Sequence, residues 1–186
     1  MFIIITSSPN AEGLTASCGW AALEGITSAG GEAEIIDISL SKLEPCRVCG
    51  DGWGQCRSEG RCVIGGLMPE LQSKIRGSDG VVLVTPVYWG QPSERMKYFM
   101  DRFRRCEAAK QGGSAAFGKQ VALIAAAGGS GNGTVSCLAE MELWCRHVGA
   151  IPQERVGITR FNRTAAMLEI TDAGARLARG EHFKRP

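Results

Sequence analysis

The chain has 186 residues, of which 44% are hydrophobic and 22% are charged, and its formal net charge is +2. This length suits one domain with a substantial core, so we expect a single domain over residues 1–186. The small charge argues against a nucleic-acid partner, and no apolar run approaches the roughly 20 residues that a membrane span needs.

The first predicted element is the strand FIIIT, residues 2–6. No basic leader precedes this strand, and its apolar run stops after Ile5, which is too short for a signal peptide. We therefore expect a cytoplasmic protein that has no membrane partner.

Further strands are predicted along the chain. Apolar, β-branched runs occupy residues 33–38, 80–86 and 120–127, and a fifth strand is expected over residues 150–159. Such runs are typical of parallel strands buried on both faces. Helical periodicity follows the first, third and fourth strands, and a last helix is expected through residues 170–179. The alternation predicts a doubly wound, three-layer α/β/α sheet, in which ligands bind beyond the carboxyl ends of the strands.

The loop after the first strand, TSSPNAEGLTAS (residues 6–17), has the composition of an anion site. It combines several hydroxyl side chains with a turn at Pro9 and Asn10, and it runs directly into a helix. The first amide groups of a helix lack internal partners, and the helix dipole favours negative charge there. The alternative is a capping turn that binds nothing. The absence of G-x-G-x-x-G disfavours a dinucleotide on this loop.

Two later loops suit a planar ring. TPVYWGQPSERMKYFMDR (85–102) places a proline, two aromatic residues and a glycine where a strand ends, and AGGSGNG (127–133) allows close approach of the backbone. The alternatives are that Tyr88 and Trp89 cap the core and that the glycine-rich segment is a plain turn.

A cysteine-rich loop at residues 43–64 holds half of the eight cysteines, namely Cys46, Cys49, Cys56 and Cys62. In a reducing cytosol such a cluster is more often metal-binding or catalytic than disulfide-bonded. Thiolates bind both iron-sulfur clusters and tetrahedral zinc, and an unmetallated loop is a third alternative.

The other cysteines and the two histidines have no clear place in a site. Cys18 and Cys145 fall on apolar helix faces and are predicted to be structural, whereas Cys106 and Cys137 receive no role. His147 and His182 are predicted to lie at the surface or at a helix end.

A basic run contains Arg102, Arg104 and Arg105. It is predicted to be a solvated face. The alternative is a contact with a nicotinamide-nucleotide phosphate or an acidic partner.

The motifs SSPNAEGLT and TPVYWGQPSERMKYFMDR, together with the cysteine loop, resemble the flavodoxin-like NAD(P)H-dependent FMN reductase superfamily, closest to iron-sulfur flavoproteins. The resemblance covers residues 2 to about 150, and PVYWG followed by a helix beginning near Pro92 is its most specific part. It implies a flavodoxin-like fold with five parallel strands. It also implies FMN, with phosphate ligands Ser8, Asn10, Gly13, Leu14 and Thr15, and ring contacts Pro86, Val87, Tyr88, Trp89, Gly90, Gly128, Gly129, Ser130, Gly131, Asn132 and Gly133.

The same resemblance implies a [4Fe-4S] cluster on Cys46, Cys49, Cys56 and Cys62. Iron-sulfur flavoproteins have a Cys-x2-Cys-x2-Cys-x5-Cys-like run, whereas this chain has Cys-x2-Cys-x6-Cys-x5-Cys, with DGWG as an insertion. Because the loop follows the second strand, we expect it to project from the same sheet edge as the flavin loops.

Three functions follow from these expectations. The first is an electron-transfer flavoprotein that passes electrons between FMN and a one-electron partner such as a ferredoxin. The second is a cluster-free reductase that passes hydride from NAD(P)H through FMN to a quinone. The third is a non-enzymatic zinc- or flavin-binding module. The resemblance also implies a homodimer or homotetramer, and an exposed Trp53 would favour such a contact.

Overall fold

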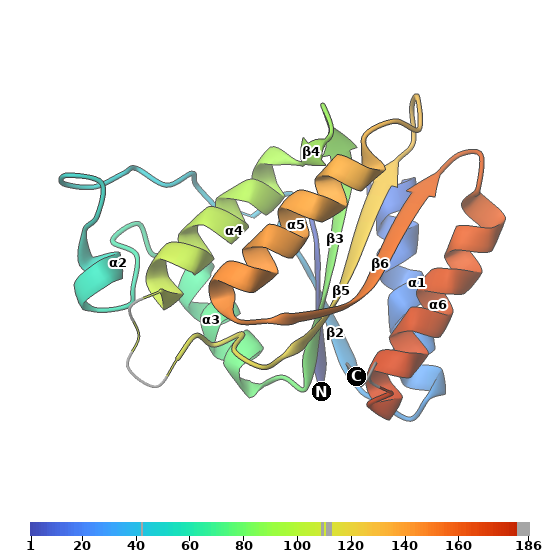
Figure 1. Cartoon of the computed structure of the whole chain (residues 1–186), viewed down its shortest axis with the longest axis horizontal. Helices are drawn as coiled ribbons and strands as arrows, with labels where there is room; N and C mark the ends of the chain where they lie inside the picture. Colours follow the sequence, from blue (N-terminus) through green and yellow to red (C-terminus); the bar gives the residue numbers. More distant parts are fainter. Residues whose placement is uncertain (42, 109, 111–112, 182–186) are drawn as a thin grey trace.

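The computed structural model describes residues 1–41, 43–108, 110 and 113–181. Five parallel strands form one sheet in the order β2-β1-β3-β5-β6, as Figure 1 shows. Their bounds are β1 Phe2–Thr6, β2 Ala33–Asp37, β3 Gly80–Tyr88, β5 Gln120–Ala127 and β6 Ile151–Thr159. The two-residue strand β4 (Gln91–Pro92) pairs antiparallel with the end of β3. The predicted doubly wound parallel sheet is confirmed.

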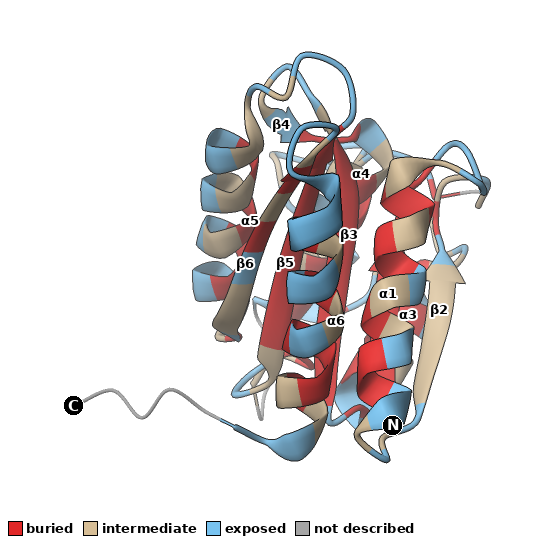
Figure 2. Ribbon diagram, turned by 90° about the vertical axis from the view of Figure 1, so that its right-hand side faces the viewer, coloured by how far each residue is buried: buried red, intermediate tan, exposed pale blue. Residues whose placement is uncertain are grey.

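Helices cover both faces of this sheet (Figures 1 and 2). One face carries α1 (Leu14–Ser28) and α6 (Arg163–Arg179), and the other carries α3 (Met68–Gly77), α4 (Glu94–Glu107) and α5 (Thr134–Val148). The short helix α2 (Gln55–Ser58) lies within the cysteine-rich loop. The sequence prediction missed α2 and α3, although Met68, Leu71 and Ile75 recur at helical spacing in α3.

The strands alternate their side chains between two apolar layers. Ile3 and Ile5 pack with α3, α4 and α5, whereas Ile4 packs with α1 and α6. Full burial of such a side chain contributes roughly 1.5–3 kcal/mol to the free energy of unfolding. The three central strands, β1, β3 and β5, are therefore stabilised by apolar packing on both faces of the sheet. Figure 2 shows β3 and β5 almost entirely buried, and every residue of β1 is buried as well.

The strand order reverses between β1 and β3, which are neighbours although β2 lies between them in the chain. The loops that leave β1 and β3 therefore diverge to opposite faces and open a crevice at the carboxyl edge of the sheet. Among the described residues, none of the helices has the length and apolar character that crossing a bilayer requires.

Candidate functional site

The loop after β1 forms a closed turn immediately before α1. Glu12 N donates to Asn10 Oδ1 over 3.0 Å, and Gly13 N donates to the Asn10 carbonyl over 3.1 Å. Within the described part of the chain, no side chain caps the start of α1 at Gly13, and its first turn holds no acidic residue. The first amide groups of α1 therefore remain available to an anion.

Three buried hydroxyl groups hold the base of this loop. Ser93 Oγ donates to Ser7 Oγ over 2.9 Å, and the main-chain N–H of Ser93 donates to Thr85 Oγ1 over 3.0 Å. These contacts tie the end of β1 to β3 and to the start of α4. Ser8 and Thr15, the predicted phosphate ligands, are buried beside them.

The segment between β3 and β4 is a tight hairpin. Trp89 has a φ of 53° and is fully exposed, so it does not cap the core, and Tyr88 is also largely exposed. A bulky residue in the left-handed region is strained by about 1–3 kcal/mol. Strain of this kind is common where a loop is held in shape for a ligand.

The glycine-rich loop after β5 packs directly on this hairpin. A Cβ at Gly133 would lie 2.7 Å from Gly90 Cα, and Ser136 Oγ donates to the Gly90 carbonyl over 2.8 Å. Gly133 has a φ of 85° and forms the N-cap of α5. On the other side of the loop, a Cβ at Gly128 would lie 3.9 Å from Leu14 Cδ2.

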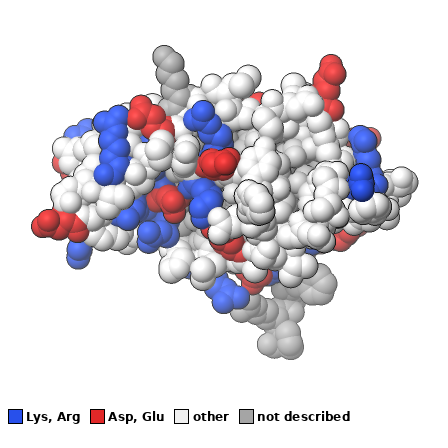
Figure 3. Space-filling model, turned by 90° about the horizontal axis from the view of Figure 1, so that it is seen from above, with Lys and Arg blue, Asp and Glu red and all other residues white. Residues whose placement is uncertain are grey.

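The three segments predicted from the sequence are therefore linked pairwise at one edge of the sheet. Figure 3 looks down on this edge and shows mainly uncharged atoms over the loops, with charged side chains gathered toward the cysteine-rich loop. An uncharged surface that ends at an uncapped helix suits a ligand with a flat ring and a phosphate.

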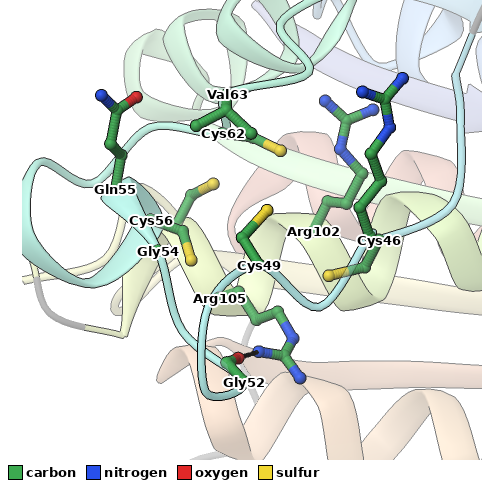
Figure 4. A pocket seen from close by; sticks show the side chains of 12 residues that line it. Cys46, Cys49, Gly52, Gly54, Gln55, Cys56, Cys62, Val63, Arg102 and Arg105 are labelled. Atoms are coloured by element: carbon green, nitrogen blue, oxygen red, sulfur yellow. Dashed lines mark hydrogen bonds between the residues drawn. The ribbon is translucent and has the colours of Figure 1, made fainter.

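The cysteine-rich loop forms a pocket with the C-terminal half of α4. Cys46, Cys49, Cys56 and Cys62 line it. Figure 4 shows their thiols around this space, together with Arg102 and Arg105 from α4. The structure adds a fifth thiol that the sequence analysis left without a role, because Cys106 also lines the pocket.

Close contacts shape the loop. A Cβ at Gly54 would lie 3.0 Å from Cys49 Cβ, so the DGWG insertion passes close to one of the predicted ligands. Trp53 is 36% exposed, and the Arg105 guanidinium lies 4.9 Å from the centre of its ring. Arg105 Nη1 also donates to the Gly52 carbonyl, so the insertion is bound to α4 rather than left free in water.

The thiols do not form a compact site for a single ion. Among the described residues, no three His, Cys, Asp or Glu side chains come close enough to hold one metal ion. A tetrahedral zinc site needs all its sulfur atoms at about 2.3 Å from one centre, whereas an iron-sulfur cluster spreads its cysteines over several irons.

Two sequence expectations are corrected. The loop begins at the carboxyl edge, but it carries α2 toward the C-terminal half of α4 (Figure 1), where its cysteines line a pocket with Arg102, Arg105 and Cys106. The 14 residues of α4 span about 20 Å, so the cysteine pocket is set apart from the loops predicted to hold the flavin in the same chain. The second correction concerns Arg102, which is only 1% exposed and is not part of a solvated face. Arg104 and Arg105 are partly buried.

The expectations for Cys18, Cys145 and His147 are met. Cys18 and Cys145 are buried, and Cys137 is buried in the core layer of α5. Burial raises the pKa of the Cys18, Cys137 and Cys145 thiols to about 12, so they stay uncharged and inert at neutral pH. His147 is exposed at the end of α5, and His182 lies outside the described residues.

Comparison with known proteins places these features in a family. The model of the NADPH-dependent FMN reductase family matches residues 1–162. An iron-sulfur flavoprotein of Methanocaldococcus jannaschii is 37% identical over 100 residues, which are 54% of this chain and 50% of that protein. The chain spans about half the length of the curated relatives it matches.

Solved structures share the fold. The NAD(P)H:quinone oxidoreductase from Methanothermobacter marburgensis has a TM-score of 0.71 at 18% identity, covering 100% of this chain and 98% of that chain. A flavodoxin from the domain Archaea has a TM-score of 0.63 at 15% identity, covering 97% and 98%. The flavodoxin-like fold predicted from the sequence is thus confirmed.

Proposed function

Because the chain belongs to the family of NADPH-dependent FMN reductases, we propose that it binds FMN at the carboxyl edge of its sheet and acts as a flavin-dependent oxidoreductase. NAD(P)H is the proposed two-electron donor. The observation that carries the proposal is the pairwise linkage of three loops beside the uncapped start of α1. FMN, when bound, supplies the chemistry of electron transfer in pairs or singly.

The residues of this chain would bind and orient the cofactor. The amide groups at the start of α1, with the hydroxyls of Ser8 and Thr15, would hold the phosphate. The hairpin at residues 86–90 and the loop at residues 128–133 would hold the ring through aromatic and main-chain contacts. The Gly90–Gly133 contact fixes the distance between these two loops and so shapes the ring site in advance.

The test is the double variant Ser8→Ala, Thr15→Val. It should purify with much less FMN than the parent protein while its thermal unfolding remains cooperative. Undiminished FMN content in the folded variant would remove these residues from the phosphate site.

For the cysteine pocket we propose a [4Fe-4S] cluster on Cys46, Cys49, Cys56 and Cys62. Four cysteines line one pocket, which fits the donor set of such a cluster, and relatives of the chain are named iron-sulfur flavoproteins. The pocket is also lined by Arg102, whose buried Nε–H has no hydrogen-bond partner in the described part of the chain, and a cation of this kind suits an anionic occupant. The protein would then connect FMN to a one-electron partner such as a ferredoxin, in the cytoplasm.

A cluster-free reductase that passes hydride from NAD(P)H through FMN to a quinone is the second candidate function. It is favoured by the wide arrangement of the thiols, because no three metal-binding side chains among the described residues approach one point. An absorption spectrum with iron and sulfide analysis on anaerobically purified protein separates the two. FMN with roughly four irons per chain supports the cluster, whereas FMN without iron supports the second candidate.

We further propose that the protein is a homodimer or homotetramer. The fully exposed Trp89 and the exposed Trp20 and Leu168, the last two of which line a groove between α1 and α6, are large apolar side chains of the kind that mark contacts. Sedimentation should show a species heavier than one chain, and a monomer at all concentrations would contradict the proposal.

A further inference from the structure

Arg102 is the largest fully buried side chain of the described structure, and it connects α4 to both ends of the cysteine-rich loop. Its Nη2 donates to the Gly65 carbonyl over 2.7 Å, and its Nη1 donates to the Glu44 carbonyl over 3.3 Å. Glu44 precedes the first cysteine of the loop and Gly65 follows the last. The guanidinium group therefore holds the loop closed around the pocket.

The third donor of this side chain is unused. Arg102 Nε is buried and has no hydrogen-bond partner among the described residues. A buried donor without an acceptor costs about 1–3 kcal/mol, so such groups usually mark a missing partner. Arg102 lines the cysteine pocket, which is where the partner would be placed (Figure 4).

The charge of Arg102 is also uncompensated. No carboxylate within the described ranges forms an ion pair with it, and the nearby buried Glu107 is paired with Arg76 and Lys110 instead. Arginine stays protonated in proteins, and a buried charge without a counter-charge is strongly unfavourable. The orphaned donor and the unpaired charge are separate observations, and both call for an anion in the pocket.

We propose that Arg102 is a positioning residue that serves as internal counter-charge and hydrogen-bond donor to an anionic iron-sulfur cluster in the cysteine pocket. This inference rests on the cluster proposed above. A cluster with four thiolate ligands is negatively charged, and it becomes more negative when it takes up one electron without a proton. A fixed cation beside it stabilises the reduced state more than the oxidised state and so raises the reduction potential.

Three variants test the proposal. Arg102→Met removes the charge and the donors but retains an unbranched apolar chain, and Arg102→Lys keeps the charge without the planar fork. Arg104→Met is the matched control, because Arg104 lies two residues further along α4, is partly buried, and lines a different surface hollow. Iron, sulfide and FMN contents are measured first, followed by anaerobic redox titration of the cluster and of the flavin.

In Arg102→Met, the equilibrium constant for one-electron reduction of the cluster should fall at least tenfold, which corresponds to about 59 mV. FMN content and flavin potential should not change, because the flavin loops lie at the opposite end of α4. The cluster of Arg102→Lys should have a reduction potential close to that of the parent protein, and the cluster of Arg104→Met should have the same potential as the parent protein.

The outcomes separate the two proposals. Parent protein without iron and sulfide overturns the cluster and the role of Arg102 together. Parent protein with a cluster, and Arg102→Met with full iron and unchanged potential, overturns only the role of Arg102. If Arg102→Met loses its iron, the Arg102→Lys variant distinguishes the remaining possibilities. An Arg102→Lys protein that keeps its iron and has a cluster reduction potential near that of the parent protein supports the counter-charge. Loss of iron in Arg102→Lys, or a potential as low as that of Arg102→Met, contradicts it.

Discussion

The contact between Gly90 and Gly133 offers a quantitative test of the proposed flavin site, through the substitution Gly133→Ala. Gly133 has a φ of 85°, where an L-residue costs roughly 1–2 kcal/mol. In addition, the new Cβ would lie 2.7 Å from Gly90 Cα and 3.1 Å from Gly90 N, so one of the two backbone segments must move. Overpacking of this kind costs about 1–3 kcal/mol.

The two costs act at different stages. The backbone strain is present with and without cofactor, so it lowers the free energy of unfolding. The steric clash can be relieved in the cofactor-free protein if the loops move apart, but it returns when FMN requires the original spacing. Because about 1.4 kcal/mol corresponds to tenfold in affinity, the dissociation constant of FMN should rise roughly 5- to 150-fold.

The assay is titration of the cofactor-free protein with FMN, followed by quenching of flavin fluorescence. Gly118→Ala is the control, because Gly118 has a φ of 71° and a Cβ added there would meet no atom within 4 Å. It carries the backbone strain without the clash, so it should lower stability and leave FMN affinity unchanged. Equal FMN affinity in Gly133→Ala and in the parent protein would refute the reasoning.

Cys56→Ala should lose iron and broad cluster absorption while FMN stays bound, whereas Cys145→Ala, at a buried position, should keep its iron. Full iron content in Cys56→Ala would show that Cys56 is not a ligand of the cluster. Glu107→Ala should lower the free energy of unfolding by about 1–3 kcal/mol in denaturant titrations, because it removes the acceptor of the buried Ala115 N–H and an acceptor of the buried Gln72 side chain. The hydrogen bond from Arg155 lowers the pKa of Glu142 from its ordinary value of 4.5 to about 2. The stabilisation is therefore present above pH 4.5 and is lost as the pH falls toward 2. Glu142→Gln should show a flatter stability profile over that window, and an unchanged slope would contradict the assignment.

The sheet and the three loops at its carboxyl edge were predictable because their signals are local. An apolar run such as residues 120–127 indicates a buried strand whatever surrounds it, and the edge to which its loop belongs follows from the handedness of parallel crossovers. The residues at 6–17, 85–90 and 127–133 could thus be assigned to one edge before any coordinates were known, and the structure links them there.

Other features depend on contacts between distant segments, and the sequence does not carry them. Arg102 stands in a basic run, which is usually solvated, and its burial follows only from the packing of α4 against a loop that lies about 40 to 60 residues earlier. Cys106 enters the cysteine pocket for the same reason. The direction of the cysteine-rich loop, away from the flavin edge and along α4, is likewise set by side-chain contacts of Arg102 and Arg105.

The sequence by itself determined the alternating elements, the three loops at the carboxyl edge and the presence of four clustered thiols, because periodicity and composition act over short stretches. Tertiary structure alone decided that Gly133 lies against Gly90, that Arg102 is buried beside the thiols, and that the cysteine pocket lies at the C-terminal end of α4, away from the loops at the carboxyl edge. These features arise where non-local surfaces meet, and close packing, rather than local preference, selects which residues face each other.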